Sequence, residues 1–556
     1  MNWYRRTLIL LTISAALPVL WAEAAMVPLH LGDGDRLLVL APHPDDDILA
    51  AGGLIQEALA LDLPVQVCFF TMGENHEIPY LLTRQHPDPL PGTARSMAPR
   101  RQIEAIAAAG QLGLSTNQIT FLGYPDGGTH EIWQRHWRDI PPFHSALTRV
   151  NAVPYERALT PGSAYASEDI LDDLMDVLRD FQPTLLVVPH PADHNADHRA
   201  LYLFTRAALG ELEAEGVTPQ VLACPVHFTQ WPEPRHFQPL RHAAPPYFLH
   251  DGTTWLEFGL APFQVTNKLA AIRRHHSQFL AFPGYLESFV RKTELFGVVS
   301  DLSFPKGIGS AKIPEEDLSR FRPDDILLEE LTHLSEPWAA LLEQHAAENQ
   351  ALAGHDNHFI EQSLSGDGLY LTLGFECAEP LTAASTLTVH LFGQRADSPF
   401  GDMPKIEIVT TPRQGITVHD LKTPLPATAV ERLPRNDTEL ILRISYAQLG
   451  TPTRLFVGAQ LSKDGLPVDW LPWRVLDLSD GQGSVSPAPP APASAPPVPS
   501  APPPAPPAPP PPPAANLAPA AVAPPPPAPP ALRLIPRVRL PPVRPPLTEA
   551  DEPVLW

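Results

Sequence analysis

The first half of the chain alternates between two hydrophobic patterns. Five apolar runs have the length of strands and lack regular polar alternation, which is typical of strands buried on both faces of a parallel sheet. These runs span residues 36–42, 64–71, 118–128, 184–190 and 221–228. Between them, residues 100–114 and 166–183 place apolar side chains at helical intervals. This alternation of strand and helix predicts a mostly parallel sheet with helices on both faces, over residues 26–300.

The pattern changes twice after residue 300. Residues 301–357 are charged and helical in pattern, and we predict a helical connector there. Residues 358–478 contain short, partly alternating runs separated by turn residues, which predicts an all-β sandwich. Residues 479–556 hold long proline-rich tracts with nothing to build a core. They predict a disordered tail, in which a polyproline II spacer extends by about 3.1 Å per residue.

The N-terminal residues have the pattern of an export signal. Arg5 and Arg6 precede a short apolar run over residues 7–20, and residues 22–24 fit a small-x-small cleavage site. We therefore predict a signal peptide at residues 1–25 and an exported protein, periplasmic or secreted. The alternative is an uncleaved signal that anchors the chain in the membrane, although the apolar run is short for a membrane span.

The net charge and the cysteine content limit the partners and the metal ligands that the chain can use. The formal net charge of −23 argues against a nucleic-acid partner, which needs a basic surface. Three cysteines are too few for a disulfide scaffold, and no two of them have zinc-ribbon spacing. Any metal must therefore be held by histidine and carboxylate side chains.

Two polar stretches directly follow predicted strands. "HPDDD" comes after the first strand and "HPADHNADH" after the fourth, so both are expected at the edge where ligands bind to parallel sheets. His43, Asp46 and His198 would supply two imidazoles and one carboxylate, which leaves a fourth position for water as in catalytic zinc sites. Asp45, whose side chain diverges from that of Asp46, could face this water as a general base. Either stretch alone could equally be a polar surface turn.

The two stretches together also carry a family resemblance. "APHPDDD" followed by "HPADHNADHRA" resembles the PIG-L/LmbE-like family of zinc-dependent de-N-acetylases, and "FLGYPDGG" and "SFVRKTELF" add to the likeness. The resemblance covers about residues 35–296 and implies a Rossmann-like sheet. In the family the first motif ends in Glu, where this chain has Asp47. We expect little effect, because neither the metal nor the water needs that residue directly.

The resemblance implies roles for individual residues. The zinc ligands by position are His43, Asp46 and His198. Asp45 corresponds to the general base. Asn195 stands where some members have a histidine that stabilises the oxyanion or protonates the leaving amine. Asparagine can donate a hydrogen bond to an oxyanion but cannot act as the acid, and the neighbouring His194 could substitute.

Three further residues are candidates with less specific signals. Asp197 is expected to orient a neighbouring side chain. Arg101 matches a family arginine that resembles a substrate contact, and the alternative is an ion pair with Glu104 on the same helix. Asp126 in "YPDGG" could bind sugar hydroxyls or cap a turn.

The resemblance implies a zinc-dependent N-deacetylase that releases acetate from an N-acetylated amino sugar or polysaccharide. One zinc per chain is the family expectation, although two imidazoles and a carboxylate also suit Fe²⁺. Two alternatives remain: an amidase that removes another acyl group from a sugar conjugate, and an exported glycan-binding or envelope-scaffolding protein with a degenerate site. A sandwich domain suggests a glycan partner by analogy, but it could also be a packing module. The proline-rich tail is either a solvated tail or a stalk that reaches the cell envelope.

Overall fold

The computed structural model describes residues 26–75, 91–228, 231–246, 249, 253–313, 358–411, 415–434 and 436–479. The predicted signal peptide and almost all of the predicted tail lie outside these residues. None of the helices in the described part of the chain combines the length and the apolar character that a membrane span requires.

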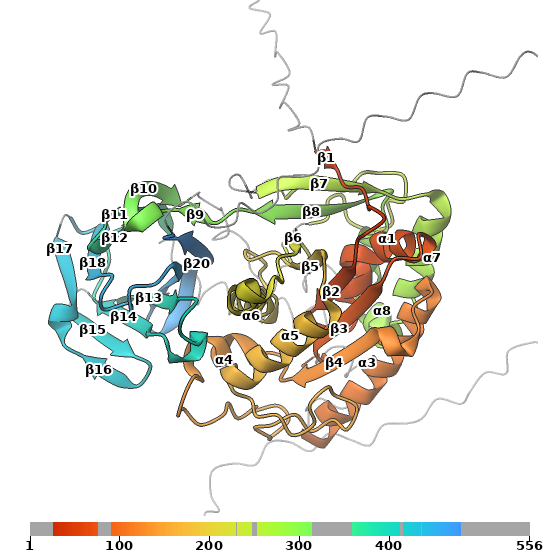
Figure 1. The fold of residues 1–556 in the computed structure, drawn as a ribbon, viewed down its shortest axis with the longest axis horizontal. Coiled ribbons are helices and arrows are strands. Elements are labelled where there is room, and N and C mark those ends of the chain that lie inside the picture. The colour runs from red at the N-terminus through yellow and green to blue at the C-terminus, as the bar shows by residue number, and fades with distance from the viewer. Residues whose placement is uncertain are drawn as a thin grey trace, which may run out of the picture. The chain divides into compact units, whose positions relative to one another are not determined.

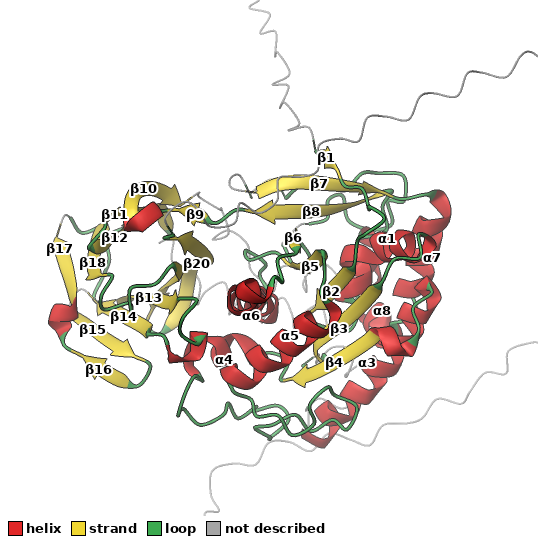
Figure 2. Cartoon of the chain, in the orientation of Figure 1, coloured by secondary structure: helices red, strands yellow, loops and turns green. Residues whose placement is uncertain are grey.

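The N-terminal part is built on one eight-stranded sheet with the order β1-β7-β8-β6-β5-β2-β3-β4 (Figures 1 and 2). Its parallel centre consists of the five predicted strands: β2 (Leu37–Ala41), β3 (Val65–Thr71), β4 (Ile119–Tyr124), β5 (Leu185–Pro189) and β6 (Gln220–Cys224). The edge adds β1 (Val27–Pro28), β7 (Thr253–Gly259) and β8 (Thr293–Val299). Because β8 runs antiparallel to both β6 and β7, the sheet is mostly rather than fully parallel, which confirms the predicted class.

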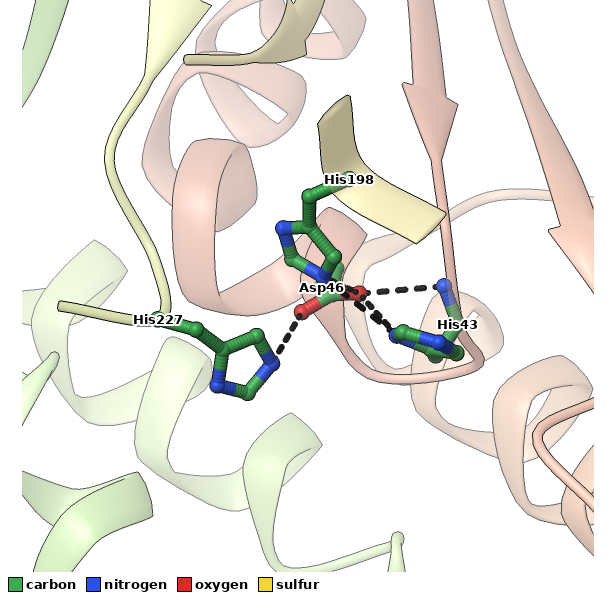
Figure 3. Close-up of side chains that lie close together, drawn as sticks. All are labelled: His43, Asp46, His198 and His227. Atoms are coloured by element: carbon green, nitrogen blue, oxygen red, sulfur yellow. Dashed lines mark hydrogen bonds and ion pairs between the residues drawn. The ribbon is translucent and has the colours of Figure 1, made fainter. Parts of the chain in front are cut away.

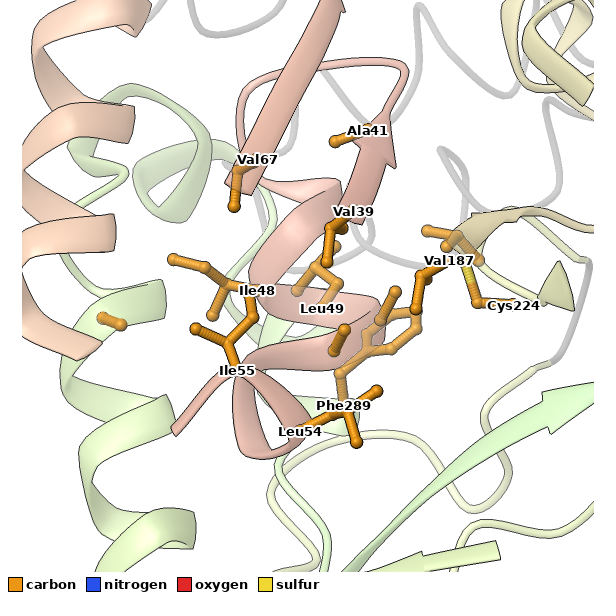
Figure 4. Close-up of a cluster of buried hydrophobic side chains, with 14 of the residues drawn as sticks. Val39, Ala41, Ile48, Leu49, Leu54, Ile55, Val67, Val187, Cys224 and Phe289 are labelled. Carbon is orange, nitrogen blue, oxygen red and sulfur yellow. The ribbon is translucent and has the colours of Figure 1, made fainter. Parts of the chain in front are cut away.

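Helices cover both faces of this sheet, and the side chains of β2 alternate between them. Leu37, Val39 and Ala41 enter one core, while Leu38 and Leu40 enter the other. The first core is packed by α1 (Asp46–Ala60), α3 (Pro91–Leu112), α7 (Pro262–Ile272), α8 (His276–Ala281) and α9 (Pro283–Ser288), in part as Figure 4 shows. The second is packed by α4 (Thr129–Arg135), α5 (Ser167–Phe181) and α6 (Ala196–Leu212). This double burial explains why the β2 sequence is apolar at every position.

The C-terminal described part forms two mostly antiparallel sheets around a third core. The five-stranded sheet contains β10 (Ile308–Ile313), β11 (Phe359–Asp367), β12 (Tyr370–Cys377), β18 (Glu439–Ser445) and β17 (Val430–Pro434). The seven-stranded sheet contains β16 (Thr423–Leu425), β15 (Gly415–Asp420), β14 (Lys405–Thr411), β13 (Ser385–Gln394), β19 (Arg454–Lys463), β20 (Leu466–Asp477) and β9 (Leu302–Ser303). Side chains from both sheets share this core, as in a β-sandwich.

The predicted helical connector is wrong at its beginning. Residues 302–303 form β9, which pairs with β20, and residues 308–313 form β10, which pairs with β11. Both segments therefore belong to the sandwich sheets, since their strand partners lie far along the chain and leave no local signal. The rest of the predicted connector, residues 314–357, lies outside the described residues.

The sandwich packs on the α/β part through an aromatic cluster. The Trp133 ring of α4 lies with its centroid 5.6 Å from those of Phe392 and Phe456, 5.5 Å from that of Phe400 and 5.9 Å from that of Trp473. These rings are buried and belong to the same core as the outer helices of the sheet. The two parts thus share a continuous hydrophobic core.

Candidate metal centre and active site

Four polar side chains meet at the carboxyl ends of three neighbouring parallel strands. His43 follows β2, Asp46 begins α1, His198 lies in the first turn of α6 after β5, and His227 follows β6 (Figure 3). The sheet order places β2, β5 and β6 side by side, so residues distant in sequence arrive at one edge.

The four side chains form a compact donor set. Asp46 Oδ2 lies 3.1 Å from both His43 Nδ1 and His198 Nε2, and these two nitrogens are 3.3 Å apart. His227 Nε2 lies 3.8 Å from Asp46 Oδ1. One ligand atom from each of the four residues lies within 4.8 Å of the others. The structure therefore brings together the predicted ligands His43, Asp46 and His198 and adds His227, which was not predicted.

The donor set fits a divalent cation. Asp46 Oδ1 is buried and has no hydrogen-bond partner among the described residues. An uncompensated carboxylate oxygen beside two converging imidazoles is costly in a buried place unless a cation joins them. Histidine nitrogen and carboxylate oxygen are ligands that zinc accepts, and Fe²⁺ accepts the same set.

Carboxylates behind the two predicted histidine ligands orient their rings. Asp193 Oδ2 lies 3.2 Å from His198 Nδ1, and the Oδ1 atom of Asp126 and the Oδ2 atom of Asp197 each lie 3.4 Å from His43 Nε2. A carboxylate on one ring nitrogen keeps the proton there and leaves the other nitrogen's lone pair for a metal. Burial lowers the pKa of His198, but the carboxylates of Asp193 and Asp46 outweigh it and raise that pKa to about 9.

Asp193 was missed by sequence reasoning, and its role can be tested. Replacing Asp193 by alanine should weaken zinc binding about 10–100-fold, because His198 loses the group that fixes its ring. Competition with a chromophoric chelator measures the zinc affinity. Asp193→Asn keeps an acceptor for His198 Nδ1, so its zinc affinity should lie between those of the wild type and Asp193→Ala. A folded Asp193→Ala protein with wild-type zinc affinity would show that the carboxylate does not support the ligand.

Asp45 is held by Arg101. Arg101 Nη2 donates to Asp45 Oδ1 at 3.1 Å and to the Pro44 carbonyl at 3.0 Å, and Nη1 donates to the Gly73 carbonyl at 2.9 Å. Burial raises the pKa of Asp45 to about 7 although the Arg101 charge opposes the rise. Gly73 has a φ of +66°, and a Cβ there would lie 2.1 Å from Arg101 Nη1, so this approach requires glycine.

The predicted alternative for Arg101, an ion pair with Glu104, is wrong. Glu104 Oε1 instead accepts from Arg100 Nε at 3.2 Å and from the Ser277 backbone. Arg101 is only 2% exposed and its donors point to the loop that carries Asp45. These contacts hold the candidate base, whereas a substrate contact by Arg101 stays a prediction.

Asn195 and His194 occupy different surroundings. Asn195 caps α6, with its Oδ1 accepting from the Asp197 amide at 2.8 Å, which leaves its Nδ2 as the donor end. The His194 ring packs against Phe228 and Trp470, with centroids 5.3 and 6.4 Å away, and burial lowers its pKa to about 4. His194 is not among the four converging residues, whose third histidine is His227.

A tyrosine orients the ring of His227. Tyr285 Oη donates to the Val226 carbonyl at 2.9 Å and lies 3.1 Å from His227 Nδ1, while the two rings stack at 5.8 Å. The hydroxyl and the stacked ring therefore orient the His227 imidazole, whose Nε2 faces Asp46 Oδ1. The strand-end argument could have found this residue, since His227 lies at the end of the fifth predicted run, residues 221–228.

Asp197 and Asp126 are tied to the backbone as well as to His43. Asp197 accepts from the Gly127 amide at 2.7 Å, from the Thr129 amide at 3.2 Å and from the Thr129 hydroxyl. Asp126 Oδ2 accepts from the Asn75 amide at 2.9 Å, and contacts with His43 lower its pKa to about 2 despite burial. Both carboxylates thus stand behind the histidine, and sugar binding by Asp126 stays a prediction.

Asp47 follows Asp46 in α1 but is not one of the four converging residues. Both carboxylate oxygens are buried and have no hydrogen-bond partner in the described part of the chain, and burial raises the pKa of Asp47 well above its ordinary value. The next turn of α1 is interrupted at Ala51, where φ is −134°.

Side chains from two later segments supply hydrogen-bond partners to the backbone at the break in α1. Glu294 of β8 accepts from the Gly53 amide at 2.6 Å and from the Leu54 amide at 2.9 Å. Lys268 of α7 donates to the Leu49 carbonyl at 2.9 Å and to Glu294 at 2.7 Å. This buried ion pair supplies partners where the helical ladder is interrupted, and it explains the glutamate of the "SFVRKTELF" motif.

The fold and the site together define an α/β domain with a candidate metal centre at the carboxyl edge of its sheet. Comparison with known proteins agrees: residues 38–209 match the sequence model of the PIG-L family, GlcNAc-PI de-N-acetylase. This segment is a PIG-L family domain, which confirms the resemblance.

Curated relatives carry the names of deacetylases. The chain is 30% identical over 186 residues to 1D-myo-inositol 2-acetamido-2-deoxy-alpha-D-glucopyranoside deacetylase 1 of Saccharopolyspora erythraea, covering 32% of this chain and 54% of that protein. It is 27% identical over 193 residues to the deacetylase of the same substrate name from Tsukamurella paurometabola, covering 33% and 57%. The chain therefore spans about half the length of these relatives.

Solved structures of deacetylases also align with this chain. N,N'-diacetylchitobiose deacetylase from Pyrococcus horikoshii aligns at 19% identity over 44% of this chain and 72% of that one, with a TM-score of 0.28. The zinc-inhibited form of teicoplanin deacetylase aligns at 18% identity over 48% of this chain and 98% of that one, with a TM-score of 0.31.

Proposed function

We propose that the protein is an exported, zinc-dependent N-deacetylase that hydrolyses the acetamide of an N-acetylated amino sugar or glycan. The observation that carries this proposal is the buried convergence of His43, Asp46 and His198 with Asp45 next to them. The names of the relatives support the substrate class, and the predicted signal peptide supports export.

The reaction needs water activation and a proton donor for the leaving amine. When bound by His43, Asp46 and His198, zinc would supply the Lewis acid that activates water and the amide carbonyl. Asp45, with a pKa near 7 and its carboxylate held by Arg101, accepts the proton of the attacking water. The water oxygen bonds to the carbonyl carbon, the C=O π electrons move to oxygen to give a tetrahedral oxyanion, and the C–N bond breaks when this oxyanion collapses.

The remaining residues stabilise the charges that develop. Asn195 offers its Nδ2 as a donor to the oxyanion, because its Oδ1 is committed to the helix cap. Protonated Asp45 returns the proton to the leaving nitrogen, which gives acetate and a free amine. His227 places its Nε2 beside Asp46 Oδ1.

Metal analysis and an acetate-release screen test the proposal. The purified protein should contain about one zinc per chain and release acetate from N-acetylglucosamine monomers, oligomers or lipid-linked forms, with Asp45→Ala as the blank. Release of a different acyl group would support an amidase instead. A folded protein that binds no divalent metal would support the scaffold hypothesis and end the deacetylase proposal.

A further inference from the structure

The loop between β5 and α6 is held by an arginine from the helix that it enters. Arg199 Nη1 donates to the backbone carbonyls of Asp193 and His194, each at 2.8 Å. The same loop places Asp193, whose Oδ1 accepts from the Asn195 amide at 2.9 Å and whose Oδ2 faces His198 Nδ1. Asp193 Oδ2 also accepts from the Val226 and His227 amides at 3.3 and 3.0 Å, so the carboxylate is held from two sides, and Arg199 braces the backbone on one of them.

The β-sandwich covers this arginine. The Trp470 ring of β20 lies 4.1 Å from Arg199 Cζ, within the range of a cation–π contact. The same ring meets His194 edge-on, with an interplanar angle of 87°. Trp470 thus brings the β-sandwich into contact with the loop between β5 and α6.

Trp470 is carried on a rigid support. It pairs with Gln460 across β19 and β20, and its neighbour Asp469 accepts from the Phe359 amide of β11 at 2.8 Å. Asp469 therefore links the two sheets of the sandwich directly beside the tryptophan. A backbone held in this way limits the positions that the Trp470 ring can take over the guanidinium.

We propose that Trp470 is a positioning residue for the metal centre, contributed by the β-sandwich. Its ring holds the Arg199 guanidinium against the two loop carbonyls, and the loop in turn holds Asp193 against His198. This inference rests on the proposed metal-binding function. The sandwich would then support the metal centre through Trp470, whether or not it also binds glycan.

Zinc affinity in single variants of the full chain tests the inference. Trp470→Ala should weaken zinc binding about tenfold, the lower end of what loss of an outer partner of a ligand causes. Trp470→Phe should keep most of the affinity, because a phenyl ring still offers a face to the guanidinium. The matched control is Trp473→Phe, a ring on the same strand that packs on Trp133, and it should bind zinc as the wild type does.

Arg199→Lys provides an independent test if Trp470→Ala does not fold. A lysine keeps the charge but lacks the planar guanidinium that lies over the Trp470 ring, so it should weaken zinc binding to a similar degree. The double variant should be no weaker than the single ones, because both remove the same brace. Wild-type zinc affinity in folded Trp470→Ala or in Arg199→Lys would overturn this inference and leave the deacetylase proposal standing. A wild-type chain that binds no zinc would overturn both.

Discussion

Replacing Asp45 by alanine is expected to lower kcat about 10²–10⁴-fold while the protein keeps its zinc. The carboxylate of Asp45 faces Arg101 and is not one of the four converging residues, so its loss removes the proton acceptor and leaves the ligand set intact. Acetate release gives kcat, and metal analysis of the same preparation gives the zinc content.

Two variants separate the loss of the base from other effects. Asp45→Asn keeps an oxygen that can accept from Arg101 but cannot take a proton, so it should be about as inactive as Asp45→Ala. Asp46→Ala removes the shared carboxylate of the donor set and should lose zinc and turnover together. A folded Asp45→Ala protein that has lost its zinc, or that turns over within tenfold of wild type, would contradict the proposed division of roles.

The parallel centre of the sheet was predictable because its strands are buried on both faces. β2 is apolar at every position, and a strand of this kind leaves a strong local signal. β7 alternates between exposed and buried positions and was not predicted. β9 and β10 were assigned to a helical connector, since two short strands whose pairing partners are remote cannot be recognised locally.

The meeting of the ligands was predictable for the same reason, but their support was not. His43, Asp46 and His198 follow recognisable strands, and the strand-end rule brings them to one edge. Nothing in the spacing of "HPADHNADH" tells which of its carboxylates turns toward His198, and the structure selects Asp193. Arg101 was recognised as a family arginine, but its bond to Asp45 depends on how α3 packs.

The glutamate of "SFVRKTELF" shows how a motif far from the ligands can bear on them. Glu294 and Lys268 are 2% and 1% exposed and join at 2.7 Å beside the break in α1. The part of α1 that precedes this break begins with Asp46 and Asp47. The pair therefore stabilises the segment that carries Asp46, the carboxylate of the candidate metal centre.

Replacing Glu294 by alanine is expected to lower the free energy of unfolding by about 3–5 kcal/mol, because it leaves the buried Lys268 ammonium without its counter-charge. The Gly53 and Leu54 amides lose their acceptors in the same change. Denaturant unfolding followed by near-ultraviolet circular dichroism measures the shift. Adding Lys268→Met should recover part of this loss, because it removes the isolated charge, while the unpaired Gly53 and Leu54 amides keep the double variant less stable than wild type.

Glu287→Ala is the matched control for Glu294→Ala. Glu287 of α9 pairs with Arg273 at the same distance of 2.7 Å, but the arginine side chain is 54% exposed and the glutamate 20%. Exposed pairs contribute about 0–1 kcal/mol, because water screens both charges whether or not they meet. If Glu294→Ala lowers the free energy of unfolding no more than Glu287→Ala does, the Glu294–Lys268 pair does not stabilise the break in α1. The orientation of Asp46 would then have to come from His43, whose backbone amide donates to the Asp46 carboxylate at 3.0 Å.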